Sequence, residues 1–458
     1  MDHRTIASVR FGFGLTPLET GPQDAADLMD QLRRPENATL IVPTQSYATR
    51  LAQFSKERRQ RKKQLAGLSD KAAKDLKKKF QKERQSVTRK LLGEDTRSLL
   101  VQRSEGSGFF ERLTAFWADN FAIGRRGGLI AGAADLPTYE TEIVRPHVMG
   151  DFSDMLHAVV NSPNMLKYLD QGRSTGPNSA VGRRSKDDVN ENLAREVLEL
   201  HTLGVSGPYT QDDVRQLALL LTGYSFDRRT GEYEFNTQIA EPGMKSILGK
   251  SYGGPRPEPR HVLRFLDDLA LHPVTAEHLA WKLAVHFVSP KPSPSLVAHL
   301  KSAYLESKGH LPKVYQALLE HPDAWSPELQ KVKQPIEFVI ALFRASNRSF
   351  QDLNNKQTGL LGKWLKQNNQ HLWQPNGPDG WPEEAGYWIN SAAIVSRFEL
   401  SGRLAQDLSN MSKYDPRRLA EQVLGASLQP TTAFAVGAAE TRADGFAMIF
   451  SSPEFNRR

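Results

Sequence analysis

The sequence predicts a mainly α-helical protein, built as one large multi-helical body that is either a helix bundle or a helical toroid. Apolar residues recur at three- and four-residue spacing through most of the chain. Only one short β-hairpin is indicated, by the alternating segments 224–227 and 233–236. With 458 residues, of which 39% are hydrophobic and 24% charged, the composition is that of a folded globular protein.

A strongly basic segment comes before most of these helices. Residues 56–90 contain 15 Lys or Arg against 4 Asp or Glu, a local charge of +11 in a chain whose formal net charge is +8. The segment is rich in helix formers, has a turn near 66–70 and contains few apolar residues. We therefore expect a projecting helical arm over 50–95, inserted in the body.

Two interpretations of this arm stay open. Its lysines and arginines either keep an exposed arm soluble, or they bind a polyanion such as an anionic glycan, a nucleic acid or a membrane surface. Nucleic acid is the least favoured partner, because Phe80 is the one aromatic residue in 56–90 that could stack on a base.

Helical spacing or helix-end residues mark the rest of the chain. No fixed-period repeat and no long flexible linker separates these segments, so we expect a single domain over 1–458, with a possible subdomain over 326–458. The predicted helices are 109–121, 137–148, 152–158, 189–203, 211–222, 259–271, 275–287, 293–306, 313–319, 335–346, 391–408, 416–424 and 442–451.

Several classes of site and location are excluded or unsupported. The chain has no cysteine, which excludes disulfides, zinc–thiolate sites, iron–sulfur clusters and cysteine nucleophiles. No apolar run is long enough to span a membrane, and no signal peptide is visible at the start. The Gly12-Phe13-Gly14 turn lacks the third glycine of a dinucleotide site. We therefore expect no metal and no cofactor, and the sequence leaves the localisation open.

The segment that points to a function is a helix predicted over 188–204. Asp188 is expected to cap its first turn, with Glu191 at the capping-box position, and Gly204 is expected to end it. At about 100° per residue one face of this helix is polar, and apolar residues cover the other. The polar face consists of Glu191, Asn192, Arg195, Glu196 and Glu199.

Glu196 is the residue that simple pairing leaves unexplained. Arg195 can pair with the glutamates four residues before and after it, whereas Glu196 meets a like charge, Glu199, three residues on. One carboxylate crowded by another is how acid–base sites raise one pKa and keep the second group ionised. The pattern favours Glu196 and Glu199 as a catalytic pair, with His201 as a third candidate. The alternatives are a structural polar network, a solvent-exposed face and, for His201, a buried core histidine.

Further residues are expected to bind a substrate around this pair. The short connection after Gly204 makes the next helix a neighbour of the glutamates, and an aromatic-rich stretch near residues 364–388 could supply flat faces that stack on sugars. An aromatic loop core is the alternative for that stretch. The expected substrate-binding residues are Glu191, Asn192, Arg195, Tyr209, Arg215, Trp381 and Trp388.

This central segment resembles the signature of a bacterial family, domain-of-unknown-function family 1800. The resemblance is carried by NENLAREVLELHTLGV at 190–205, YT at 209–210 and LTGY at 221–224. Other stretches match across nearly the whole chain: RFGFG (10–14), FW (116–117), YLD (168–170), KSILG (245–249), HPVTA (272–276), KL (282–283), HF (286–287), DGWP (379–382) and SPEF (452–455). Members typically carry histidine around the Phe-Trp pair, where this chain has Ala118, Asp119 and Asn120.

The resemblance implies a bacterial origin but no mechanism, because the family has no settled activity. Its members often occur beside a protein that resembles the alkaline-phosphatase and sulfatase superfamily, and many look exported, which would place this chain in the periplasm or outside the cell. A non-catalytic export or assembly factor for that phosphatase-like neighbour is therefore one expectation for its function.

The residues themselves favour an enzyme. We expect a hydrolase that acts on a polymeric substrate, with a glycan favoured over a peptide, through Glu196 and Glu199. A lyase on acidic polysaccharide is a close variant, in which Asn192 or Arg195 would neutralise a uronate and His201 or Tyr209 would take its proton. A deep pocket at the glutamates would favour the enzyme, and a fully paired network without a cavity would favour the assembly factor.

Overall fold

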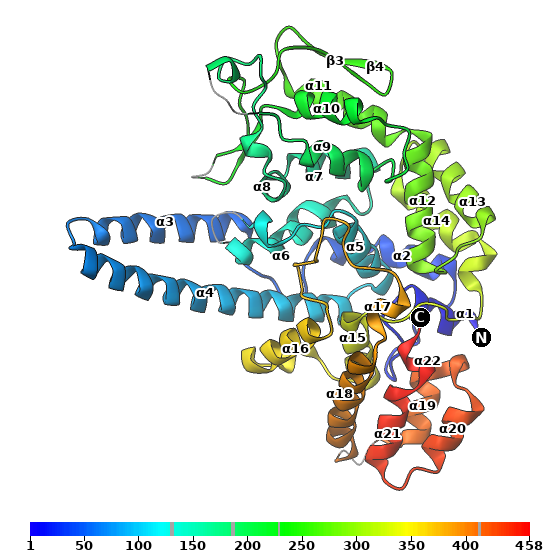
Figure 1. Ribbon diagram of the computed structural model, residues 1–458. Coiled ribbons are helices and arrows are strands. Elements are labelled where there is room, and N and C mark those ends of the chain that lie inside the picture. Colours follow the sequence, from blue (N-terminus) through cyan, green and yellow to red (C-terminus); the bar gives the residue numbers. More distant parts are fainter. Residues whose placement is uncertain (129–131, 185–187, 228–229, 411–413) are drawn as a thin grey trace.

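The computed structural model describes residues 1–128, 132–184, 188–227, 230–410 and 414–458. Within these ranges the protein is mainly helical, with 22 α-helices and two small two-stranded antiparallel sheets, which confirms the predicted fold class. A long two-helix arm projects from one side of the helical body, and a group of C-terminal helices lies below it (Figure 1). No helix in the described ranges combines the length and the apolar character needed to cross a bilayer.

The N-terminal part of the chain builds the arm. After α1 (His3–Arg10) and α2 (Ala25–Leu32), the arm consists of α3 (Tyr47–Leu65) and the 36-residue α4 (Asp70–Glu105). At its base the buried Arg50 forms two hydrogen bonds with Asp95, from Nη2 to Oδ1 at 2.6 Å and from Nη1 to Oδ2 at 2.8 Å. Arg50 also donates to the Ala134 carbonyl, so this pair fastens both arm helices to the body.

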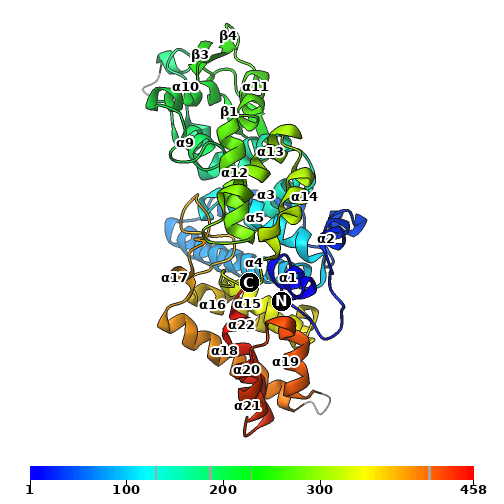
Figure 2. The ribbon, with the colours of Figure 1, turned by 90° about the vertical axis from the view of Figure 1, so that its right-hand side faces the viewer.

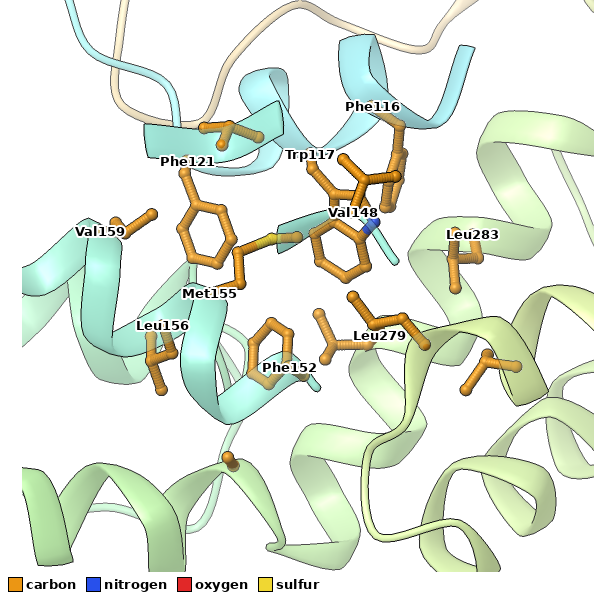
Figure 3. Close-up of a cluster of buried hydrophobic side chains, with 14 of the residues drawn as sticks. Phe116, Trp117, Phe121, Val148, Phe152, Met155, Leu156, Val159, Leu279 and Leu283 are labelled. Atoms are coloured by element: carbon orange, nitrogen blue, oxygen red, sulfur yellow. The ribbon is translucent and has the colours of Figure 1, made fainter. Parts of the chain in front are cut away.

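The central body holds the largest hydrophobic cluster. Phe116 and Trp117 of α5 (Gly108–Asn120), with Phe121 directly after this helix, face Phe152 and Met155 across this cluster (Figure 3). The helices around it are α5 (Gly108–Asn120), α6 (Leu136–Thr138), α7 (Phe152–Asn161), α8 (Pro163–Tyr168), α9 (Asn192–Glu199), α10 (Gln211–Leu221), α11 (Pro259–Ala270), α12 (Pro273–Phe287), α13 (Pro294–Glu306) and α14 (Leu311–Glu320).

Two β-hairpins are attached to this body. Strand β1 (Tyr224–Phe226) pairs with β2 (Tyr233–Phe235) where the sequence predicts a hairpin; residues 228–229 of its predicted turn lie outside the described residues. The hairpin of β3 (Gly243–Ile247) and β4 (Lys250–Gly254) was not predicted. Its turn places Leu248 at φ 50° and Gly249 at φ 75°. A tight hairpin turn usually has Asn-Gly or Asp-Gly at its two central positions, because these residues adopt positive φ readily. This turn has leucine at the first position, where it is rare, so the sequence carries no recognisable turn signal.

The C-terminal helices pack around a hydrophobic cluster of their own. They lie at the end of the molecule opposite to α10 and the β3–β4 hairpin (Figure 2). The division of the chain near residue 326 stays a prediction. These helices are α15 (Pro335–Ala345), α16 (Asn355–Gln367), α17 (Ala385–Trp388), α18 (Ser391–Ser409), α19 (Pro416–Leu424), α20 (Pro430–Gly437), α21 (Arg442–Ser451) and α22 (Pro453–Asn456).

Candidate functional site

The helix predicted over 188–204 is shorter than expected at its N-terminal end. Helix α9 begins at Asn192, and Glu191 precedes its first turn without a side-chain cap. Asp188 does not cap the helix, because its carboxylate accepts a hydrogen bond from the adjacent Val189 amide. The side chain of Asn190 instead accepts from the Asn192 amide at 2.9 Å. The capping-box prediction for α9 was therefore wrong by one turn of helix.

The C-terminal end of α9 is widened. The amides of Leu200 and His201 both donate to the carbonyl of Glu196 at 3.0 Å, and the Leu203 amide reaches back five residues. This wider turn ends the regular helix at Glu199, before the predicted boundary. Gly204 has φ 84°, the left-handed conformation predicted for it.

The polar face of α9 forms the ion pairs that its spacing predicts. The Arg195 guanidinium lies 3.4 Å from Glu191 Oε2 and 3.1 Å from Glu199 Oε1. Gln211 of α10 bridges the group, since it accepts from Arg195 at 2.9 Å and donates to Glu191 at 2.8 Å. Tyr209 lies beside them, and burial followed by the charge of Glu199 raises the pKa of its phenol. Glu199 is thus paired with both Arg195 and Tyr209.

Glu196 is in a different situation from its neighbours. Its side chain is half-buried, and within the described ranges it has no hydrogen-bond or ion-pair partner. Burial, then the charges of Glu199 and Asp379, raise the pKa of Glu196 to about 7, against the opposing effect of Arg195. Near neutral pH this carboxyl therefore keeps a proton for part of the time.

Asp379 belongs to the loop between α16 and α17, which runs back across the body and also reaches α5. Two residues on, the Trp381 amide donates to Asp119 Oδ1 at 2.9 Å. Gly380 has φ 79°, and a Cβ at this position would lie 2.6 Å from Asp119, so only glycine fits the contact. Burial raises the pKa of Asp119 to about 7. The nearby Lys282 has a pKa lowered by burial, which the Asp119 charge partly offsets.

The same loop carries Glu383 into a paired charge network. Glu383 Oε1 lies 2.5 Å from His286 Nδ1, and its Oε2 lies 2.6 Å from Lys331 Nζ. Burial would raise the pKa of Glu383, but these two partners hold it well below its usual range. Burial lowers the pKa of His286 to about 4, so the ring is neutral near pH 7.

Glu337 of α15 completes this network from the other side. Its carboxylate pairs with Arg112 of α5 and, at 2.9 Å, with Arg458. All three side chains are buried. Burial would raise the pKa of Glu337, but the two guanidinium groups outweigh it and lower the pKa to about 2. Glu383 and Glu337 are thus fully paired acids in the interior.

A cavity of about 100 Å³ lies between these groups. Its walls are mostly apolar, and Glu196 and Glu199 are not among its lining residues. The loop joins the cavity to the α9 face, because Trp381 lines the cavity while the charge of Asp379 acts on Glu196. The polar and aromatic lining residues include Arg112, Asp119, His286, Glu337, Trp373 and Trp381.

Two predicted site residues, His201 and Trp388, lie away from an open substrate surface. His201 is buried against Phe121, with ring centroids 5.0 Å apart, and burial lowers its pKa to about 3. Trp388 is 2% exposed and donates to the Pro382 carbonyl, so its ring has no free face for a sugar. Trp381, the other predicted substrate-binding tryptophan, is partly exposed. Arg215 is exposed on α10.

Sequence reasoning missed the groups that the loop brings in, above all Asp119 and Asp379. An acid three residues after a buried Phe in a mainly apolar helix was the available signal for Asp119. Where the chain is described, no group of three or more His, Asp or Glu side chains is placed to hold a metal ion.

Comparison with known proteins gives a family and no further relative. No curated protein and no solved structure matches this chain. The model of one family, described as a protein of unknown function (DUF1800), matches residues 6–457. This match covers nearly all of the sequence and agrees with the resemblance of the α9 segment, so the chain belongs to the DUF1800 family.

Proposed function

We propose that the protein is a hydrolase acting on a polymeric substrate, a glycan rather than a peptide, with Glu196 as its general acid. The observation that carries this proposal is the contrast on α9: Glu196 is half-buried and unpaired among the described residues, while Glu199 is paired with Arg195 at 3.1 Å. An acid catalyst that works near neutral pH needs a pKa near 7, which is the value that burial and neighbouring carboxylates give Glu196.

Asp379 is the best candidate for the second carboxylate. It is exposed at the loop and close enough to raise the pKa of Glu196, whereas Glu199 is already occupied by Arg195 and Tyr209. In glycoside hydrolysis one carboxyl protonates the leaving oxygen and an ionised carboxylate activates water or attacks the sugar carbon. Peptide hydrolysis by two acids requires two adjacent carboxyl groups to share one proton, and the acid adjacent to Glu196 on α9, Glu199, is already paired with Arg195.

The lyase alternative has less support. Arg195 is neutralised by Glu191 and Glu199, so it is poorly placed to neutralise a uronate. His201 is buried and has no exposed edge from which to take a proton.

A non-catalytic export or assembly factor for a phosphatase-like neighbour is the second candidate. Two observations favour it. The network of Glu191, Arg195, Glu199 and Gln211 is closed by mutual hydrogen bonds, as in a face that serves structure or docking. The cavity beside Trp381 is also not lined by Glu196 or Glu199. Glu196 is the residue that this interpretation leaves without a role.

The test is release of reducing ends from a panel of neutral and acidic glycans by the parent protein and by Glu196→Gln. We expect Glu196→Gln to lose about 100-fold or more of the rate. The parent rate should decline above about pH 7 as Glu196 loses its proton. Glu384→Gln, an exposed glutamate in the same region, is the matched control and should keep the parent rate. A Glu196→Gln variant that cleaves as fast as the parent at every pH would exclude the acid role.

A further inference from the structure

We infer that the arm binds a linear anionic polysaccharide, a polyuronate, along the outward face of α4. This inference names the substrate class and therefore rests on the proposed function. The outward face carries a row of five cations, Lys71, Lys74, Lys78, Lys82 and Arg89, and every one of these side chains is exposed. At 100° per residue they share one narrow sector of the helix.

The row is regular as well as basic. At a rise of about 1.5 Å per residue, its three- and four-residue steps space the first four charges about 5–6 Å apart, and the row extends over about 27 Å. A single exposed ion pair contributes little free energy, but a polymer with repeated charges engages several at once. The spacing suits a chain with one carboxylate on each sugar, laid along the helix.

The opposite face of α4 shows that this row is the free side of the arm. Ala73, Leu76, Phe80 and Val87 are half-buried there. The guanidinium of Arg61, from α3, lies 5.2 Å from the centroid of the Phe80 ring. The two arm helices therefore use their apolar side chains against each other and leave cations outside.

The covered aromatic residues argue against other polyanions. Phe54 is buried and lies under the guanidinium of Arg84, so neither it nor Phe80 is free to stack on a base. Duplex DNA carries a charge about every 1.7 Å along its axis, a much denser array than this row. A membrane-bound helix would present apolar side chains toward the lipid, whereas the face of the row has cations and Gln85 and no apolar side chain.

The arm is also connected to the cavity beside the loop that carries Asp379. The Arg50–Asp95 pair fastens it to the body, and beyond that pair α4 continues to Leu99 and Arg103, which line the cavity next to Trp381. Helix α4 is unbroken along this length (Figure 1), so it joins the cationic row to residues of the cavity wall.

The experiment measures fluorescence anisotropy of labelled oligogalacturonate titrated with the full chain. The test variant is Lys74→Glu/Lys78→Glu/Lys82→Glu. Its control is Lys356→Glu/Lys363→Glu/Lys366→Glu, which makes the same charge change at exposed lysines of α16. We expect the parent to bind, with an affinity that falls as NaCl rises, and the arm variant to bind about tenfold more weakly or worse. The control variant should stay within about twofold of the parent.

Three results would overturn the inference: no binding of oligogalacturonate by the parent, equal losses in both triple variants, or tighter binding of duplex DNA or phosphatidylserine vesicles than of the glycan. Far-ultraviolet circular dichroism and thermal melting identify a variant that fails to fold. Glu196→Gln separates this inference from the proposed function, because it should bind like the parent. If the protein binds the glycan without cleaving it, the arm site stands and the proposed hydrolase is wrong. If the arm variant cleaves the glycan as fast as the parent, the hydrolase stands and the arm site is wrong.

Discussion

Two neighbouring groups of acids in this protein have opposite pKa shifts. Glu196 on α9 and Asp119 on α5 have pKa values raised to about 7, whereas Glu337 and Glu383 are held below their usual range. All four are at least partly buried, so burial alone does not separate the groups. The difference lies in their partners, because each acid with a lowered pKa contacts two cationic or imidazole side chains.

An acid paired with buried cations stabilises the fold, whereas an acid without such a partner is available for chemistry. Glu337 lies between Arg112 and Arg458, and its charge compensates theirs in the interior. Glu196 has no such partner in the described chain, and its charge would be uncompensated beside Glu199. Predictions for these residues test whether the division is real.

The largest effect is expected for Glu337→Gln. The substitution removes the buried carboxylate that Arg112 and Arg458 share and leaves Arg458 a contact of 3.9 Å with Glu383, which should lower the free energy of unfolding by about 3–5 kcal/mol at pH 7. Chemical denaturation measures this loss, and exposed Glu384→Gln is the control. Because the folded pKa of about 2 lies below the ordinary 4.5, the stabilisation is present above about pH 4.5 and disappears as the pH falls toward 2. A loss of the same size at pH 3 as at pH 7 would contradict the pairing argument.

A smaller effect of opposite sign is expected for Glu196→Gln. The folded pKa of about 7 lies above the ordinary 4.5, so the parent loses stability as the pH rises from 4.5 to 7. After allowance for solvent screening of a half-exposed group, the variant should be more stable than the parent by about 1 kcal/mol at pH 8. The two should be equally stable near pH 4. A variant that melts below the parent at pH 8 would place Glu196 in the structural group.

The smallest effect is expected for Glu199→Gln. It removes one half-exposed ion pair to Arg195, which contributes about 0.5 kcal/mol at low salt and less at high salt. Removing this like charge should also lower the pKa of Glu196. The free energy of unfolding of the variant should therefore stop falling at a lower pH than that of the parent. An unchanged pH profile would show that Glu199 does not act on Glu196.

Local sequence rules predicted the parts of this site that local geometry controls. Helix α10 lies where a helix was predicted over 211–222 and begins with a capping box of Thr210 and Asp213, and the α9 ion pairs follow from four-residue spacing. The start of α9 was misplaced because Asp188 found a nearer donor than the helix amides. Cap residues permit a helix start, and competition between hydrogen bonds decides it.

The other half of the site could not be read from spacing. The contact between Asp119 and Trp381 joins residues 262 positions apart, and no periodicity in either segment signals it. For the same reason the burial of Trp388 behind Pro382 was not foreseen. The long-range path of one loop turns a predicted pair of glutamates into a group that includes Asp379.

The length of α4 has a mechanical consequence. Asp95 sits about 37 Å from the tip of the arm at Asp70, but only about 12 Å from Arg103 in the cavity wall, at 1.5 Å per residue. The Arg50–Asp95 pair is therefore a fulcrum placed near one end of a rod. If the rod tilts as a unit about this point, the cavity wall moves about one third as far as the tip and in the opposite direction. A load on the arm would reach the cavity as a small, reversed displacement.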